Sequence, residues 1–226
     1  KSWAGQRVKI FFDGVMTDAE IMINGKPAGE MHQGGFYRFN YDIPELLNLG
    51  KKNQLEVKVA KESANRSINA AERKADWWLF GGIYRPVWLE VLPQIHMEHF
   101  VLNADHQGKL QAAVDMAGDA KGHEIIVSVR SLKDGKTVYT SNGQTTITHS
   151  ISNSDKEQMI SGEWASIIPW STENPNLYVA KLELKNPEGK IVQTRETRIG
   201  FRTVEFFPQD LSLIHISEPT RPEPIS

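Results

Sequence analysis

The chain has 226 residues and a formal net charge of −2, with 39% hydrophobic and 24% charged residues. This length holds one large or two ordinary domains, and so small a charge gives no electrostatic reason to expect nucleic acid or an anionic membrane as a partner. The absence of cysteine excludes disulfides and thiolate metal sites, and no apolar run approaches the roughly 18 residues of a membrane span. The compartment, periplasmic or cytoplasmic, stays open.

Strands are predicted along the N-terminal part, where apolar and polar residues alternate with a period of two. The predicted strands are Arg7–Phe12, Ala19–Ile23, Phe36–Tyr41, Gln54–Val59 and Pro86–Leu92. Asn24-Gly25 directly follows the second of these strands. Both residue types accept a positive φ, so this pair predicts a tight hairpin turn.

One short helix is predicted between the third and fourth strands. Asp42 is a candidate cap, Pro44 lies in the first turn, Leu46 and Leu47 are apolar, and Gly50 would end the helix. This pattern predicts two turns at most.

A domain boundary is predicted at Pro93, after which short β runs continue. The further predicted strands are His99–Asn103, Lys109–Asp115, Glu124–Leu132, Lys136–Thr140, Thr145–Ile151, Leu177–Lys185 and Ile191–Ile199. Asp134-Gly135 and the segment Asn186–Gly189 predict hairpin turns. Strands at this spacing favour two β-sandwich domains that meet near residue 93. They exclude a TIM barrel, which needs about 250 residues and eight helices.

The last residues do not continue the pattern. From Leu211 the sequence LSLIHISEPTR resembles the translation of a transposase-type sequencing adapter over residues 211–221. We therefore expect residues 211–226 not to belong to the natural protein; the alternative is a genuine proline-rich tail.

Two clusters of residues could carry chemistry. The first is the loop His32–Phe36, in which paired glycines free the backbone. The second is Asp76–Arg85, which begins with a carboxylate beside two indoles. Aromatic faces stack on the apolar face of a pyranose, and a carboxylate accepts hydrogen bonds from vicinal hydroxyls. The alternative is structural: Trp77 and Trp78 fill the core, Asp76 caps a turn and His32 is an ordinary hydrogen-bonded histidine.

Other chemistries find no support in the sequence. No two histidines have zinc-site spacing, and no glycine-rich loop follows a strand as in phosphate-binding motifs. No two carboxylates are paired as general acid and nucleophile. The run Glu72–Lys74 is expected to lie on a solvated loop or helix face.

The chain resembles glycoside hydrolase family 2, which includes β-galactosidases, β-glucuronidases and β-mannosidases. The resemblance extends to about Phe206. The stretches that carry it are Trp3–Val8, Phe12–Val15, Ile23–Gly25, His32–Phe36 with Asp42-Ile43, Asp76–Val87, Pro169–Tyr178 and Gly200–Phe206. It implies an all-β chain: a galactose-binding-like jelly-roll sandwich at residues 1–93, an immunoglobulin-like β-sandwich at 94–207, and the start of a hinge from 208.

The family resemblance also implies roles for three residues. In this family the jelly roll lends an aspartate to the substrate pocket, and Asp76 is the matching position. The loop of His32 lies beside the pocket in relatives, and Trp77 is the tryptophan expected in its wall. The family's acid/base and nucleophilic glutamates lie on a catalytic TIM barrel that is missing here. The resemblance therefore implies no catalytic residue, no metal and no cofactor in this chain, which we expect to be inactive.

Three functions remain open at this stage. The first is the non-catalytic N-terminal fragment of a retaining, β-galactosidase-like exo-glycosidase, with a β-linked sugar as partner and homo-oligomers in the intact enzyme. The second is a stand-alone carbohydrate-binding or adhesion protein built from two sandwiches. The third is a structural pair of domains that contacts no sugar.

Overall fold

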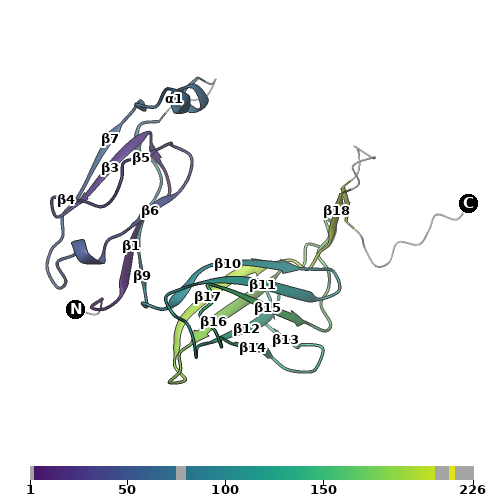
Figure 1. The fold of residues 1–226 in the computed structure, drawn as a ribbon. Coiled ribbons are helices and arrows are strands. Elements are labelled where there is room, and N and C mark those ends of the chain that lie inside the picture. Colours follow the sequence, from purple (N-terminus) through teal and green to yellow (C-terminus); the bar gives the residue numbers. More distant parts are fainter. Residues whose placement is uncertain (1–2, 75–79, 207–213, 217–226) are drawn as a thin grey trace, which may run out of the picture. The chain divides into compact units, whose positions relative to one another are not determined.

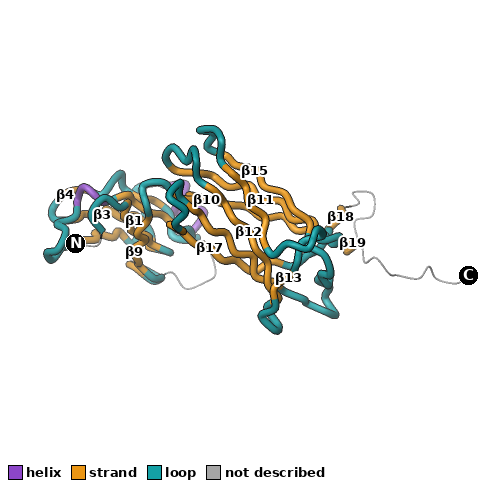
Figure 2. Tube along the Cα trace, turned by 90° about the horizontal axis from the view of Figure 1, so that it is seen from below, coloured by secondary structure: helices purple, strands orange, loops and turns teal. Residues whose placement is uncertain are grey.

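The computed structural model describes residues 3–74, 80–206 and 214–216. The chain forms two compact units, Lys1–Gln94 and Ile95–Ser226 (Figure 1). Each unit is built almost entirely from strands, and the only helical segments described lie in the first unit (Figure 2).

The first unit contains three small antiparallel sheets. The sheet orders are β6-β1-β9, β4-β3-β5 with β7 on β3, and β2-β8. The strands are β1 (Arg7–Phe12), β2 (Val15–Met16), β3 (Asp18–Ile23), β4 (Lys26–Pro27), β5 (His32–Gln33), β6 (Phe39–Asp42), β7 (Leu55–Ala60), β8 (Gly82–Ile83) and β9 (Val87–Leu92). The core follows the predicted alternation, because β1 and β3 each bury every second side chain. The predicted turn is confirmed, with φ of 53° at Asn24 and 78° at Gly25.

The short helix predicted after Phe36–Tyr41 forms as a 3₁₀ turn and not as an α-helix. Only a single 3₁₀ turn, η1 (Pro44–Leu46), forms there, and Ile43 rather than Asp42 precedes it. Asp42 ends β6, where it pairs with Lys9 across the ladder, and its carboxylate accepts hydrogen bonds from Arg7. Asp42 therefore belongs to strand β6 and does not act as the predicted helix cap. β6 itself begins at Phe39, three residues later than predicted.

The α-helix of this unit, α1 (Arg66–Glu72), was not predicted. Its N-cap is Asn65, whose side chain accepts a hydrogen bond from the Ser67 amide at 2.9 Å. None of its residues is buried, so no apolar stripe with a 3.6-residue period marks it.

The second unit is a sandwich of two antiparallel sheets. One sheet has the order β10-β11-β15, and the other β13-β12-β16-β17 with β14 also on β12. The strands are β10 (His96–Ala104), β11 (Lys109–Ala117), β12 (Glu124–Ser131), β13 (Thr137–Val138), β14 (Thr146–Ser150), β15 (Glu157–Glu163), β16 (Tyr178–Lys185) and β17 (Ile191–Ile199). The buried side chains of both sheets, with Trp164 and Phe201, form one core.

Strand β15 was missed because its sequence carries a glycine and four polar residues among its seven. Gly162 is required by packing: a Cβ there would lie 1.6 Å from the Ile147 Cδ1. After the sandwich, the backbone of β18 (Val204–Phe206) pairs with β19 (Ile214–Ile216).

The all-β fold class is therefore confirmed. The described part of the chain holds one seven-residue α-helix, so it contains nothing of a TIM barrel. No helix in that part is long and apolar enough to cross a membrane.

Candidate functional site

The loop after β5 is shaped by Gly34. β5 pairs with the start of β3, where His32 is opposite Ala19 and Gln33 is opposite Asp18. Gly34 has φ of +112°, and a Cβ at this position would come within 2.2 Å of the Tyr37 hydroxyl oxygen. That hydroxyl donates to the Gln33 carbonyl at 2.7 Å. The position therefore requires glycine both for its backbone conformation and for the close approach of Tyr37.

His32 is half-buried in an aromatic setting. Its ring stacks on Phe39 with centroids 3.7 Å apart and meets Tyr37 edge-on at 5.3 Å. Burial lowers its pKa, and the hydrogen bond to Gly34 and the charges of Glu72 and Asp18 only partly oppose this. The ring is therefore neutral at pH 7. Its Nε2 lies 2.9 Å from the Gly34 carbonyl oxygen, which can only accept, so Nε2 carries the proton and Nδ1 is left as an acceptor.

Asp18 is a buried carboxylate that joins two loops. It is 4% exposed, and its Oδ2 accepts from the Gln33 side chain at 3.1 Å and the Ala64 amide at 2.8 Å. Burial favours the neutral acid, but hydrogen bonds from Ser63, Ala64 and Gln33 outweigh this effect and hold the pKa of Asp18 below its usual value. The ionised side chain thus fastens the His32 loop to the turn that precedes α1.

The end of α1 holds the same loop from another side. Asn69 anchors the helix, because its side chain accepts from the Ser63 amide at 2.9 Å and donates to the Ser63 carbonyl at 2.6 Å. At the last helical residue, the Glu72 Oε2 accepts a hydrogen bond from the Gly35 amide at 2.8 Å. A bond from a backbone amide to a carboxylate is among the stronger hydrogen bonds in proteins.

Tyr84 completes the arrangement. Its hydroxyl donates to the Gly35 carbonyl, and its ring stacks on the exposed Phe80 with centroids 6.0 Å apart. Gly14 makes room for this ring, since a Cβ there would lie 2.9 Å from the Tyr84 Cζ. Gly35 is therefore held at both its amide and its carbonyl. We call the contacts of Glu72 and Tyr84 with Gly35 the Gly35 clamp.

The clamp joins the two clusters that the sequence singled out. Glu72 lies three residues before, and Tyr84 five residues after, the segment 75–79. Asp76 and Trp77 belong to that segment and lie outside the described residues, as does Trp78. The backbone on both sides of that segment is thus tied to the loop that carries His32.

A second polar cluster fastens the end of β1. The Asp13 Oδ1 accepts from the Trp88 indole at 3.1 Å and from the Arg38 guanidinium at 2.7 Å. The bond from Trp88 is the main reason why the pKa of Asp13 lies below its usual value. Trp88 also stacks on Phe11, with centroids 4.1 Å apart. These side chains satisfy one another's hydrogen-bonding groups, and they stabilise the sheet.

Metal chemistry has no support in this geometry. Among the described side chains, no group of three histidines or carboxylates is arranged to hold a metal ion.

Two family models cover most of the chain. Residues 1–93 match the model described as "Glycosyl hydrolases family 2, sugar binding domain", and residues 95–202 match the model "Glycosyl hydrolases family 2".

The chain belongs to glycosyl hydrolase family 2.

Curated relatives within glycosyl hydrolase family 2 include enzymes of more than one substrate type. A β-galactosidase of Thermoanaerobacter pseudethanolicus is 28% identical over 208 residues, which are 90% of this chain and 27% of the relative. A putative β-glucuronidase of Formosa agariphila is 28% identical over 215 residues, 88% of this chain and 23% of the relative. The chain thus spans about a quarter of the length of these relatives.

Solved structures of family 2 members share the fold. A β-glucuronidase of Bacteroides uniformis superposes with a TM-score of 0.72 at 23% identity, over 91% of this chain and 25% of its own. A β-glycosidase of Bacteroides vulgatus gives a TM-score of 0.69 at 25% identity, over 92% of this chain and 25% of its own. The family resemblance drawn from the sequence is confirmed, as are the sugar-binding and immunoglobulin-like types of its two domains.

Sequence reasoning missed the residues that hold the site together. Glu72 was expected on a solvated face, but it is half-buried and its carboxylate holds Gly35. The two residues are 37 positions apart, and no local pattern relates them. Asp18 was not singled out, and Tyr84 was included only within the stretch Asp76–Val87 that resembles the family.

The clamp can be tested by amide exchange. We expect Glu72→Ala to speed hydrogen exchange at the Gly35 amide about tenfold or more, because removing a charged acceptor loses roughly 1.5–3 kcal/mol of local stability. The measurement is residue-resolved exchange by NMR. Glu56→Ala is the control: Glu56 is an exposed glutamate on β7, bonded to Gln54. Equal exchange at Gly35 in both variants would disprove the clamp.

Proposed function

We propose that this chain forms the non-catalytic, sugar-contacting part of a retaining β-glycosidase of the β-galactosidase type. The observation that carries the proposal is the Gly35 clamp, which joins the His32 loop to both flanks of the segment with Asp76 and Trp77. It lies within the residues that match the family's sugar-binding model. A rigid junction between two loops suits a pocket wall, because fixed loops lose little freedom when a ligand binds.

His32 supplies a defined hydrogen-bonding group in this proposal. With Nε2 donating to Gly34, the Nδ1 of the neutral ring accepts a hydrogen bond from a sugar hydroxyl. Phe39 and Tyr37 fix the orientation of the ring. Asp76 accepts from two vicinal hydroxyls, and Trp77 offers an aromatic face to the pyranose. These roles of Asp76, Trp77 and His32 rest on the family resemblance and on the clamp.

The catalyst lies elsewhere in the proposed enzyme. Retaining hydrolysis needs two carboxyl groups about 5–5.5 Å apart, one protonated and one ionised. We place both on a barrel that follows an immunoglobulin-like domain at residues 94–207, with residues 1–93 forming the sugar-binding domain and 208–226 a hinge start and foreign tail. The pocket is shared with this barrel, and the intact enzyme is a homo-oligomer. Similar curated relatives include six named β-galactosidases and two named putative β-glucuronidases, and the larger number favours a β-galactoside as substrate.

Reading the gene beyond codon 210 in genomic DNA tests this proposal. We expect the reading frame to continue into a barrel domain with the family's catalytic glutamates. An in-frame stop at that point would refute it and leave the stand-alone carbohydrate-binding protein as the better explanation.

The purified 226-residue chain should not hydrolyse nitrophenyl β-galactoside or β-glucuronide. The physical reason is that the two catalytic glutamates of the proposed enzyme lie on a barrel, and the described residues contain nothing of a barrel. Release of nitrophenol at a rate proportional to protein, from a sample free of host glycosidase, would contradict the prediction. A host extract lacking the gene is the control.

A further inference from the structure

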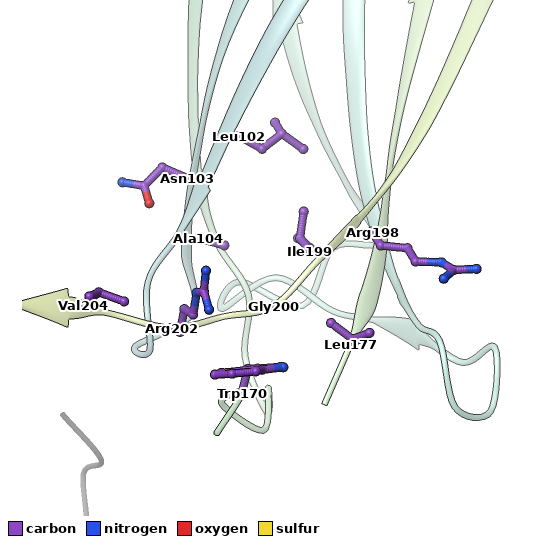
Figure 3. A pocket seen from close by; sticks show the side chains of 10 residues that line it. All are labelled: Leu102, Asn103, Ala104, Trp170, Leu177, Arg198, Ile199, Gly200, Arg202 and Val204. Carbon is purple, nitrogen blue, oxygen red and sulfur yellow. The ribbon is translucent and has the colours of Figure 1, made fainter. Parts of the chain in front are cut away.

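The second unit contains a pocket of about 550 Å³ that the proposed function does not use. It lies where the end of β10, the end of β17 and the segment before β16 meet (Figure 3). Its volume is within the range of small-ligand sites. All of the described residues that line it belong to the second unit.

Its floor is a cation–π pair, with the Arg202 guanidinium above the ring of Trp170. The guanidinium carbon of Arg202 lies 5.0 Å from the centroid of the indole, and Figure 3 shows the ring lying flat beneath it. Backbone bonds fix both partners: the Trp170 amide donates to Phe201 and the Arg202 amide to Ala104, each at 2.9 Å. Gly200 lets the ring lie close, since a Cβ there would be 3.1 Å from the Trp170 Cβ. The backbone of both residues is therefore fixed, and the contact with the ring favours one position of the guanidinium.

The pocket carries positive charge. Arg202 lies in it, Arg198 lines its edge with a side chain that points away from the other lining side chains (Figure 3), and no aspartate or glutamate is found among its described lining residues. Neither arginine forms an ion pair with a described residue. A guanidinium carries five N–H donors, so one without an ion-pair partner can bind an oxyanion in a two-pronged manner.

The remaining walls suit a ring compound rather than a bare ion. Asn103 offers an amide, which can donate to and accept from hydroxyl groups, and Leu177 and Ile199 add apolar surface. We propose that this pocket binds a carboxylate-bearing sugar, with the carboxylate on Arg202 and the ring against the apolar wall. This site is separate from the His32 loop and stands whether or not the proposed catalytic assembly exists.

NMR titration of the ¹⁵N-labelled 226-residue chain tests the site, with the Trp170 indole and Arg202 Nε–H signals as reporters. We expect glucuronate to give saturable shifts at millimolar concentration. Galactose, which lacks the carboxylate, and sulfate, which lacks the ring, should bind at least about tenfold more weakly at constant ionic strength. Equal binding of galactose or of sulfate, or no saturable shift with glucuronate, would overturn the proposal.

Variants separate recognition from folding. Arg202→Lys keeps the charge but loses the planar fork, and Asn103→Asp adds a repelling charge at an exposed position. Both should weaken glucuronate binding about tenfold while the other signals of the unit stay dispersed. Arg130→Lys is the control, because Arg130 pairs with Glu196 outside the pocket. Undiminished binding in both pocket variants, or an equal loss in the control, would refute the assignment.

Discussion

Gly108→Ala should destabilise the second unit by about 2–5 kcal/mol. Gly108 is buried in the turn between β10 and β11 and has φ of +96°, where an L-residue is strained by roughly 1–2 kcal/mol. A Cβ there would also lie 2.3 Å from the backbone carbonyl oxygen of Trp164. That oxygen cannot rotate away as a side chain could, so overpacking adds roughly 1–3 kcal/mol.

Gly135→Ala is the matched control for this prediction. Gly135 also lies in a hairpin turn with a positive φ, +71°, but nothing lies within 4 Å of a Cβ built there. We expect a loss of only about 1–2 kcal/mol, from the backbone alone. Urea unfolding followed on the NMR signals of second-unit residues gives both free energies. Equal losses of unfolding free energy in the two variants would show that the backbone near Trp164 moves aside with little loss of stability.

Gln193→Ala should destabilise the same unit by about 2–6 kcal/mol. Gln193 is a buried residue of β17 whose side chain spans to β10, where the register shifts between Met97 and His99. Its Oε1 accepts from the Met97 amide at 2.6 Å, and its Nε2 donates to the Met97 carbonyl at 3.2 Å. Alanine would leave both backbone groups buried without this partner, at roughly 1–3 kcal/mol each.

The control for Gln193 is Gln111→Ala. Gln111 is exposed on β11, and its replacement should change the free energy of unfolding by less than about 0.5 kcal/mol. The same urea experiment measures both. An equally small loss of unfolding free energy in Gln193→Ala and Gln111→Ala would contradict the prediction. It would mean that water replaces the amide at the bulge and that the bridge between the two sheets does not stabilise the unit.

Most strands could be predicted because one face of each is buried, and burial imposes a period of two on the sequence. β17 was predicted to the residue, and β1 as well. Where burial imposes no period, prediction failed. α1 buries no side chain, and β15 includes a glycine because Ile147 occupies the space above it. In such segments the deciding contacts are made by residues far away in the chain.

In the candidate site, too, the features with a local sequence pattern could be predicted and the contacts between distant residues could not. The loop of His32 could be found because paired glycines and an aromatic residue are a local signal. The contacts that hold this loop could not be predicted, because Asp18, Glu72 and Tyr84 reach it from three other parts of the chain, each through a hydrogen bond. Gln193 gave no signal either, because a buried glutamine and an exposed one are the same letter in an alternating strand.

The manner in which α1 is attached has a consequence for temperature and ligand binding. The helix contributes no buried side chain, so its attachment rests on the hydrogen bonds of Asn69 with Ser63 and of Glu72 with the Gly35 amide rather than on apolar area. Its opening should therefore expose little hydrophobic surface and carry almost no change in heat capacity. Such a segment opens well below the melting point of the core. A sugar bound at the Gly35 loop would then stabilise the closed form of α1 and raise the temperature at which the helix opens.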